Sequence, residues 1–420
     1  MTGRRRVAIV GMGVVSPFGA GVGAFERGLR EGRSGIRRIG LFDAAALPVR
    51  IAGEAAEFDP GLVMDPGELR HVSRAVPMAL LAAREAFEDA GLDPGSFTLE
   101  ERRRTGVLIG SGGGPLDFTE AQFRKHFEAG GAGQSLYAIP SSTPGTIASE
   151  VSMRFDLRAE SHLVSTGCTS SLDAVGYAAR AIRHGDGERY LAGGVDTPLA
   201  PGIVRGFTLM KVLTTAWNDA PERGSRPFAA DRDGFVLGEG AFVFVLEPFE
   251  LALARGARIR GEIAGYGSTC EAFHRVRLRE DGEEPARAMA KALRDAGLSP
   301  ADVDTVSVHG TATVLNDRIE ARALRLALGA RADRVPMHAL KSMIGHPQGA
   351  SGAASLAASV VSLEGGFVPP TLNCERPDPA CALPLVASAA RGCRLESALV
   401  NTIGFGSKNS ALVLRRAAGS

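Results

Sequence analysis

Short β-rich segments alternate with alanine-rich helical segments along all 420 residues, and this alternation constrains the fold more than any other feature. It predicts an α/β architecture. We expect strands at residues 7–10, 105–109, 162–165, 241–246, 303–308 and 398–401. We expect helices at residues 76–90, 169–184, 284–296, 318–328 and 349–363.

Glycine-rich turns are expected directly after three of these strands. GMG follows Val10, GSGGG follows Ile109 and GFG follows Ile403. Glycine has no Cβ and tolerates positive φ, so the backbone amides of such turns can approach a ligand closely. The three turns are therefore candidate parts of a binding site.

A seam near residues 255–260 divides the chain into two expected halves, 1–255 and 256–420. Each half opens with a strand that carries a glycine turn, and each later has a strand that ends at a reactive type of residue. This weak internal pattern suggests a duplicated fold. Residues 211–239 are polar and turn-rich, and so long a loop in a compact domain is usually functional.

Overall charge and cysteine content exclude several classes of protein. The formal net charge of +1 gives no general attraction to nucleic acid or to a membrane surface. No window approaches the ~18–20 uninterrupted apolar residues of a membrane span. The five cysteines are odd in number and form no CxxC pair, so we expect a reduced, cytoplasmic protein. The arginines before Val7 are interpreted as leading into a first strand rather than a secretory signal.

The segment SHLVSTGCTSSLDAVGYAARAI reads as a strand, a turn of small residues and a helix. Leu172, Val175, Ala179 and Ile182 recur at helical spacing, which places Cys168 at the start of the helix. The N–H groups and dipole at a helix start favour a thiolate, which is a competent nucleophile toward a thioester carbonyl. The alternative, a small buried structural cysteine, stays open on these residues alone.

Three further segments carry candidate site residues. His309 ends a predicted strand in HGTAT, although a lone histidine there is more often structural. Lys341 and His346 share the polar turn KSMIGHPQGASG, and Phe405 stands between two glycines in GFGSKN. Cys168, His309 and His346 could in principle ligate zinc, but no HExxH or CxxC spacing supports this, so no metal is expected.

Taken together and in this order, these segments resemble the β-ketoacyl synthases of the thiolase superfamily, over essentially the whole chain. The matching motifs are GCTSSLDA, HGTAT, KSMIGHPQGASG, GFGSKN and RPFAADRDGFVLGEGA. The resemblance implies a thiolase-like fold of two pseudo-duplicated halves in αβαβα layers. It also implies a condensing enzyme that forms carbon–carbon bonds between thioesters.

By this resemblance, Cys168 holds the acyl chain as a thioester, and His309 and His346 donate hydrogen bonds to the carbonyl of a malonyl thioester. Loss of CO₂ leaves an enolate whose oxyanion needs such donors in a water-poor site. The backbone N–H groups of Cys168 and Phe405 would form the oxyanion hole for acyl transfer. Phe405 also matches the family's gating phenylalanine.

The resemblance implies supporting roles for further residues. Lys341 would support the histidines, with Glu320 and Asp317 as its acidic companions. Thr311 and Thr313 match contacts to the phosphopantetheine arm. No cofactor is implied, because the thioester itself activates the α-carbon. An acidic acyl carrier protein would need a basic patch, for which the candidates are Arg70, Arg74 and Lys211.

The pathway is less constrained than the chemistry. Gly113 stands where many fatty-acid enzymes have a bulky residue, Ser407 and Lys408 alter the usual gate motif, and Ser307 replaces a more usual asparagine or glutamate. Other segments look more like ketosynthase subunits of bacterial type II polyketide synthases, which pair with a cysteine-less chain-length factor. We favour polyketide over fatty-acid elongation, with a homodimer as the default if no such partner exists.

Two alternatives of other kinds fit the sequence less well. A non-catalytic acyl-binding scaffold would keep the fold but lose the cysteine or the histidines, and all are present here. A degradative thiolase would use a second cysteine near the C-terminus, where this chain has GFG instead.

Overall fold

The computed structural model describes residues 5–387 and 389–417. Its strands are β1 (Val7–Ser16), β2 (Gly19–Ala20), β3 (Arg37–Arg38), β4 (Ile51–Ala52), β5 (Thr105–Gly110), β6 (Ser161–Val164), β7 (Arg189–Asp196), β8 (Gly240–Pro248), β9 (Gly261–Cys270), β10 (Thr305–Ser307), β11 (Met337–His338), β12 (Phe367–Val368), β13 (Arg391–Gly392), β14 (Ser397–Gly404) and β15 (Lys408–Arg415). Its α-helices are α1 (Val22–Glu31), α2 (Pro66–Leu69), α3 (Ala75–Asp89), α4 (Leu99–Arg103), α5 (Leu116–Ala129), α6 (Ala138–Ser142), α7 (Thr146–Phe155), α8 (Ser170–His184), α9 (Pro201–Leu209), α10 (Phe249–Ala254), α11 (Glu283–Ala296), α12 (Val314–Leu328), α13 (Lys341–Ile344) and α14 (Ser351–Gly365).

The main sheet has 11 strands, and its two sides repeat one order. The path runs β11-β10-β14-β15-β9-β1-β8-β7-β5-β6, with β2 paired to β1 beside it. Each side contributes five strands to this path, which we number in chain order within their half. From the junction of β1 and β9 outward, both sides then have the order first, fifth, fourth, second and third. The sides meet where β1 and β9 pair, at Ala8 with Glu262 and Ile9 with Gly261. The fold is therefore a duplication joined by a short seam.

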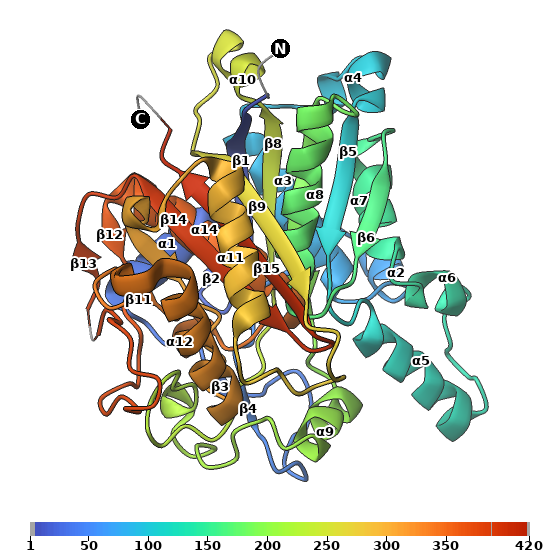
Figure 1. Cartoon of the computed structure of the whole chain (residues 1–420). Coiled ribbons are helices and arrows are strands. Elements are labelled where there is room, and N and C mark those ends of the chain that lie inside the picture. The colour runs from blue at the N-terminus through green and yellow to red at the C-terminus, as the bar shows by residue number, and fades with distance from the viewer. Residues whose placement is uncertain (1–4, 388, 418–420) are drawn as a thin grey trace.

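Helices cover both sides and also fill the middle (Figure 1). The helices α8 and α14 pack on each other, and both contact strands of the two halves. The helix α3 packs on the outer side of β1 and β8, while α11 packs on β9 and β15. The layers thus follow the order helix, strand, helix, strand, helix.

Alternate side chains of the central strands enter different cores. On β8, Phe242 and Phe244 belong to the central core with α8 and α14, whereas Val243 and Val245 belong to the outer core with α3. All four side chains are fully buried. Strands covered on both faces need apolar residues at every position, which explains the continuous run AFVFVLE.

The glycines Gly11 and Gly13 do not form the predicted turn, because β1 continues through them to Ser16. A Cβ on these glycines would lie 2.0 and 1.9 Å from carbonyl oxygens of α3. In the second half, Gly265 and Gly267 of β9 would meet carbonyl oxygens of α11 at 2.1 and 2.3 Å. Their purpose is close helix–strand packing, and the device occurs once in each half.

The other predicted strands and helices are present with shifted ends. The largest shift among the helices is in α12, which begins at Val314 because the Thr313 side chain caps it by accepting the N–H of Asn316. The expected boundary at 255/256 falls in the connection between α10 and β9. Across the ranges that the structure describes, no helix combines the length and apolar character needed to cross a bilayer.

Candidate active site

Cys168 lies in the turn between β6 and α8, directly before the helix, and is 5% exposed. The turn is fixed by the buried Asp173 carboxylate, which accepts hydrogen bonds from the hydroxyls of Thr166 (2.6 Å) and Thr169 (2.9 Å). The same carboxylate accepts the hydroxyl of Tyr266 on β9 at 2.5 Å. The turn that carries Cys168 in the first half is therefore anchored on the second half.

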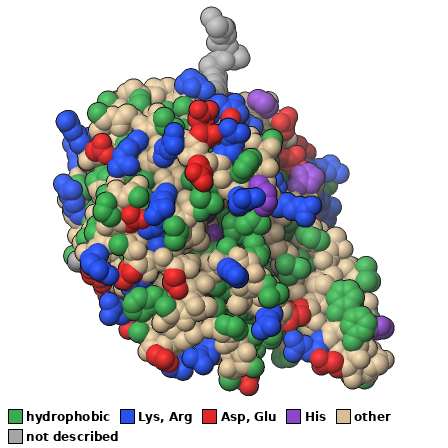
Figure 2. All heavy atoms as spheres, turned by 60° about the horizontal axis from the view of Figure 1, so that its bottom comes forward, with side chains coloured by type: hydrophobic (Ala, Val, Ile, Leu, Met, Phe, Trp, Pro, Cys, Tyr) green, Lys and Arg blue, Asp and Glu red, His purple; other side chains and the backbone are tan. Residues whose placement is uncertain are grey.

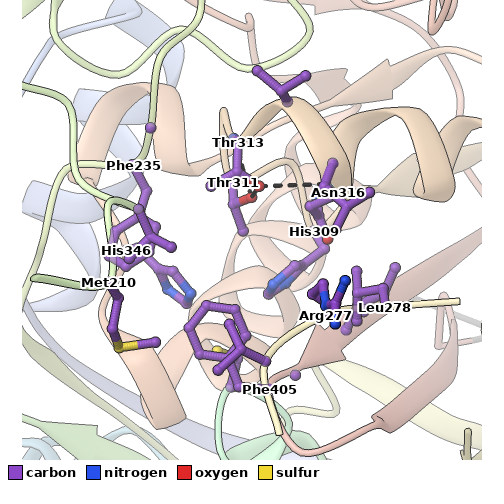
Figure 3. Close-up of a pocket in the computed structure, with 18 of the residues that line it drawn as sticks. Met210, Phe235, Arg277, Leu278, His309, Thr311, Thr313, Asn316, His346 and Phe405 are labelled. Atoms are coloured by element: carbon purple, nitrogen blue, oxygen red, sulfur yellow. Dashed lines mark hydrogen bonds between the residues drawn. The ribbon is translucent and has the colours of Figure 1, made fainter. Parts of the chain in front are cut away.

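The structure brings His309 and His346 to Cys168. His309 follows β10 and His346 follows α13, and both side chains are almost fully buried. Figure 3 shows the two rings pointing toward each other above the ring of Phe405. Their centroids are 5.4 Å apart, and the Cys168 sulfur and one nitrogen of each ring lie within 4.8 Å of one another.

Hydrogen bonds orient both imidazole rings. The Lys341 ammonium donates to the carbonyl oxygen of His309 (2.6 Å) and lies 3.3 Å from its Nδ1. An ammonium only donates, so Nδ1 accepts and Nε2 carries the proton. The Ser351 hydroxyl lies 2.9 Å from Nδ1 of His346. Nε2 of each ring is thus left for the cavity.

Burial keeps the imidazoles uncharged. Burial first, and the Lys341 charge second, lower the pKa of His309 and of His346 well below its ordinary value. Burial also lowers the pKa of Lys341 to about 8, although Cys168 and Glu320 oppose this shift. At neutral pH the site therefore holds two neutral imidazoles beside one cation.

The Cys168 thiol differs from the expectation of a thiolate favoured by the helix start. Burial raises the pKa of Cys168 to about 11, while the Lys341 charge and the backbone N–H of Phe405 act in the opposite direction. Burial outweighs these groups, so the sulfur rests as a thiol.

The carboxylates of Glu320 and Asp317 accept hydrogen bonds from backbone N–H groups, so their role is wider than the predicted support of Lys341. Glu320 accepts the N–H groups of His309 (2.6 Å) and Gly310 (2.7 Å) and the side-chain amide of Asn401 (2.7 Å). Burial raises the pKa of Glu320 to about 6. Asp317 accepts the N–H of Phe228 at 2.7 Å and pairs with Arg232 at 3.3 Å, which fixes the long loop 211–239.

A cavity of about 350 Å³ leads to Cys168 and is called the outer cavity here. Thr311 and Thr313 line it, with their hydroxyls 3.0 Å apart. Its other lining residues include Cys168, Met210, Lys211, Phe235, Arg277, Leu278, His309, Asn316, His346 and Phe405. The predicted pantetheine contacts thus lie on the wall of the same opening as Cys168.

A second cavity of about 200 Å³, the inner cavity, lies on another side of Cys168. Gly113, Leu116 and Phe207 are among its lining residues, and Phe405 lines both cavities. Phe405 stands in the turn between β14 and β15, and its backbone N–H acts to lower the pKa of the Cys168 thiol. This side chain therefore lies at the boundary of the two cavities.

Sequence reasoning missed Asp196, which ends β7 beside the inner cavity. It accepts the hydroxyl of Ser111 (2.8 Å) and the N–H groups of Gly112 (2.7 Å) and Gly349 (2.6 Å). Burial raises the pKa of Asp196 to about 6. The sequence signal for Asp196 was an acidic residue at the end of an apolar strand. For Asp173 the signal was the aspartate within GCTSSLDA.

The three cations predicted to bind a carrier protein differ in position. Arg70 and Lys211 are exposed, and Lys211 alone of the three lines the outer cavity. The Arg74 guanidinium instead pairs with the buried Glu239 at 3.0 Å and donates to the carbonyl of Ala55. Arg74 is thus an internal ion-pair residue rather than a free surface cation, because it compensates a buried carboxylate.

Comparison with known proteins agrees with this geometry. The family model "Beta-ketoacyl synthase, N-terminal domain" matches residues 4–252, and "Beta-ketoacyl synthase, C-terminal domain" matches residues 260–375. The chain is 42% identical to the actinorhodin polyketide putative beta-ketoacyl synthase 1 of Streptomyces coelicolor, over 99% of this chain and 89% of that protein. It is 39% identical to 3-oxoacyl-(acyl-carrier-protein) synthase 2 of Coxiella burnetii, over 98% of this chain and 99% of that protein.

Among solved structures, the ishigamide ketosynthase/chain length factor superposes with a TM-score of 0.91 at 33% identity. That match covers 99% of this chain and 100% of the other. The predicted thiolase-like α/β fold of two duplicated halves is confirmed. The chain, with Cys168 in the first half and His309 and His346 in the second, belongs to the β-ketoacyl synthase family.

Proposed function

We propose that this enzyme condenses a malonyl unit carried on an acyl carrier protein with an acyl chain held on Cys168, and so extends a polyketide by two carbons. The observation that carries this proposal is the approach of the Cys168 sulfur and both imidazoles within 4.8 Å in one buried site. A nucleophile and two neutral donors at this spacing serve both acyl transfer and enolate formation.

Acyl loading uses the Cys168 thiol. Its sulfur attacks the carbonyl of the incoming thioester, the new S–C bond forms, and the bond to the pantetheine sulfur breaks. The thiol proton passes, by way of a neutral imidazole, to the departing pantetheine sulfur. The backbone N–H groups of Cys168 and Phe405 face the tetrahedral oxyanion. Because burial raises the pKa of Cys168, removal of this proton is part of the barrier.

Condensation uses the two histidines. The malonyl carboxylate leaves as CO₂, and its bonding electrons form an enolate whose oxygen accepts from Nε2–H of His309 and of His346. The enolate carbon then attacks the Cys168 thioester, the new C–C bond forms, and the C–S bond breaks. The sulfur takes up a proton and returns to the thiol. Neutral donors suit this step because they avoid burying a second full positive charge beside Lys341.

No metal or organic cofactor enters this proposal. The sulfur and the two imidazole nitrogens could reach one ion by distance alone. However, the Lys341 contact at Nδ1 leaves the proton of His309 on Nε2, and a protonated nitrogen offers no lone pair to a metal. The five free cysteines and the thiol chemistry fit the reducing cytoplasm, which we propose as the location.

For the carrier protein, we propose docking at the mouth of the outer cavity with Lys211 and Arg70 as cations. Arg74 contributes less than predicted, because Glu239 already engages its guanidinium. Thr311 and Thr313 then face the pantetheine arm inside the cavity. Salt should weaken this docking, since an acidic partner meets exposed cations.

The polyketide assignment is favoured by the inner cavity. Gly113 and Leu116 both line this cavity. A Cβ added at Gly113 would lie only 3.0 Å from Leu116 Cδ1, so the absence of a side chain at Gly113 keeps this space open. A bulky residue would therefore shorten the space for an acyl chain. The alternative is a housekeeping β-ketoacyl synthase II of fatty-acid elongation, and the similar identities of 42% and 39% to the two kinds of relative do not separate them.

The proposed protein partner is a homologous chain-length factor without the cysteine, with a homodimer as the alternative. The strand β6 ends the sheet, and an unpaired edge invites a second chain. Beside it, α5 and α6 project from the body in Figure 1, and Figure 2 shows hydrophobic side chains gathered on this arm. Its exposed members include Phe123 (57%), Phe127 (78%), Leu136 (76%) and Ile139 (80%). Such a patch marks an interface rather than a free surface.

Two measurements test the proposal. Mass spectrometry of the enzyme incubated with an acyl carrier thioester should show an adduct on the Cys168 peptide, and its absence would refute the loading step. Purification alongside the candidate partner should give a 1:1 complex with a cysteine-less homologue. Isolation of a homodimer with full fatty-acid elongation activity would instead support the alternative.

A further inference from the structure

Ser407, in the turn between β14 and β15, has a side chain that the chemistry above does not use. It is 3% exposed. Its hydroxyl accepts the N–H groups of Phe273 and His274, each at 3.2 Å, and donates to the carbonyl oxygen of His274 at 3.1 Å. A hydroxyl has one donor and two acceptor sites, so this one is fully used.

The backbone around Ser407 joins the same segment. The N–H of Glu271 donates to the Ser407 carbonyl, and the N–H of Gly406 donates to the carbonyl of Arg275, both at 2.8 Å. Ser407 has φ 66°, in the left-handed region that favours glycine. The serine therefore keeps an unfavourable backbone conformation in the position where its hydroxyl makes these three bonds.

Residues 271–279, called the wall segment here, form one side of the outer cavity. Val276, Arg277 and Leu278 line that cavity, and Figure 3 shows Arg277 and Leu278 beside His309. The segment is braced internally, because Nδ1 of His274 accepts the N–H groups of Val276 and Arg277, each at 3.1 Å. The wall segment is thus held in one conformation, and the turn between β14 and β15 is hydrogen-bonded to it.

Phe405 stands two residues before Ser407 in the same turn. It lines both cavities, as does Cys168. An acyl chain that passes from the outer to the inner cavity must displace the Phe405 side chain. The turn can swing only if the Ser407 bonds break or if the wall segment moves with it.

We propose that Ser407 is a positioning residue that latches the Phe405 turn to the wall segment, so that release of this latch limits how fast long acyl chains load onto Cys168. The inference rests on the proposed function, because it concerns acyl loading. Decarboxylation of a malonyl unit takes place beside the histidines in the outer cavity and does not require this release. The latch therefore separates the two half-reactions.

The test compares wild type, Ser407→Ala and Ser407→Gly, with Lys408→Ala, at the first residue of β15, as the adjacent control. Loading is followed by rapid quench and mass spectrometry of the Cys168 peptide, with octanoyl-pantetheine and acetyl-pantetheine as probes. Malonyl-pantetheine decarboxylation is measured in parallel. Loss of the hydroxyl bonds should raise the octanoyl loading rate on the order of tenfold, with acetyl loading, decarboxylation and the control nearly unchanged.

Equal octanoyl loading rates in wild type and both variants would overturn the latch while leaving the proposed function intact. A parallel fall of loading and decarboxylation would also overturn it, since that pattern marks a purely structural role. Absence of any Cys168 adduct in wild type would instead overturn the proposed function. Should the variants not fold, hydrogen exchange on wild type decides: octanoylation must speed exchange of the Phe273 and His274 amides, and unchanged exchange refutes the latch.

Discussion

Replacement of Glu320 by glutamine tests how the carboxylate supports His309. The carboxylate meets three donors, the N–H groups of His309 and Gly310 and the side-chain amide of Asn401. A glutamine has only one acceptor oxygen, so its NH₂ group must face at least one of these donors. A buried donor left without a partner costs about 1–3 kcal/mol.

A second effect acts in the opposite direction. Burial raises the pKa of Glu320 from 4.5 to about 6, so the folded protein binds a proton between these pH values that the unfolded chain does not. The free energy of unfolding therefore rises as the pH falls through this window, by about 2 kcal/mol at 1.36 kcal/mol per unit. Above pH 6 the buried charge costs that amount, and Glu320→Gln removes the cost.

The two effects offset at pH 7.5, so the free energy of unfolding of Glu320→Gln should lie within about 1 kcal/mol of wild type. The offset in free energy does not restore the position of His309, because its backbone loses a hydrogen bond to the Glu320 carboxylate. A misplacement of about 1 Å can reduce a rate by about 10²-fold, and decarboxylation of malonyl-pantetheine should fall by 10- to 100-fold. At pH 5 the variant should be about 1 kcal/mol less stable relative to wild type than at pH 7.5, because pH 5 lies inside the window between the two pKa values.

Chemical denaturation at the two pH values and release of CO₂ measure these quantities. Glu283→Gln on α11 is the control, since it removes an exposed carboxylate of the second half. Wild-type decarboxylation in Glu320→Gln would refute the idea that Glu320 positions His309. Loss of only the pH dependence near 6, with the maximal rate retained, would indicate proton transfer by Glu320 instead.

Three further outcomes are expected. Cys168→Ala should abolish the acyl adduct, and a persistent adduct on another cysteine would show that the nucleophile is misassigned. His309→Ala and His346→Ala should each suppress malonyl decarboxylation by at least about 10²-fold, as is typical for loss of one oxyanion donor; CO₂ release at the wild-type rate in both would contradict their role. Gly113→Leu should exclude octanoyl but retain acetyl loading on Cys168, because the new side chain meets Leu116 within the inner cavity; unaltered octanoyl loading would mean that the chain takes another route.

Features that depend on neighbouring residues could be predicted from the sequence. Features that depend on contacts between residues far apart in the chain could not. The strand–turn–helix around Cys168 follows from hydrophobic periodicity over neighbouring residues, and the duplicated α/β order follows from alternation. By contrast, Arg74 looked like a surface cation because its partner Glu239 is 165 residues away. Gly11 and Gly13 looked like a turn because the helix α3 that they contact lies far along the chain.

The buried position of Asp173 also depends on a contact with a residue far away in the sequence. Its carboxylate receives hydroxyls from its own turn and from Tyr266 on β9. Nothing adjacent to Asp173 in the sequence indicates the second set of partners. The family resemblance predicted which residues are catalytic, whereas these anchors are visible only where the structure places the two halves together.

The helices α8 and α14 have a consequence for how the molecule melts. They lie between the two half-sheets and share a single hydrophobic core with strands of both. Neither half can unfold without exposing side chains on which the other depends, so heating should produce one cooperative transition rather than two. Inactivation and unfolding should then coincide, since the catalytic geometry is lost with that shared core.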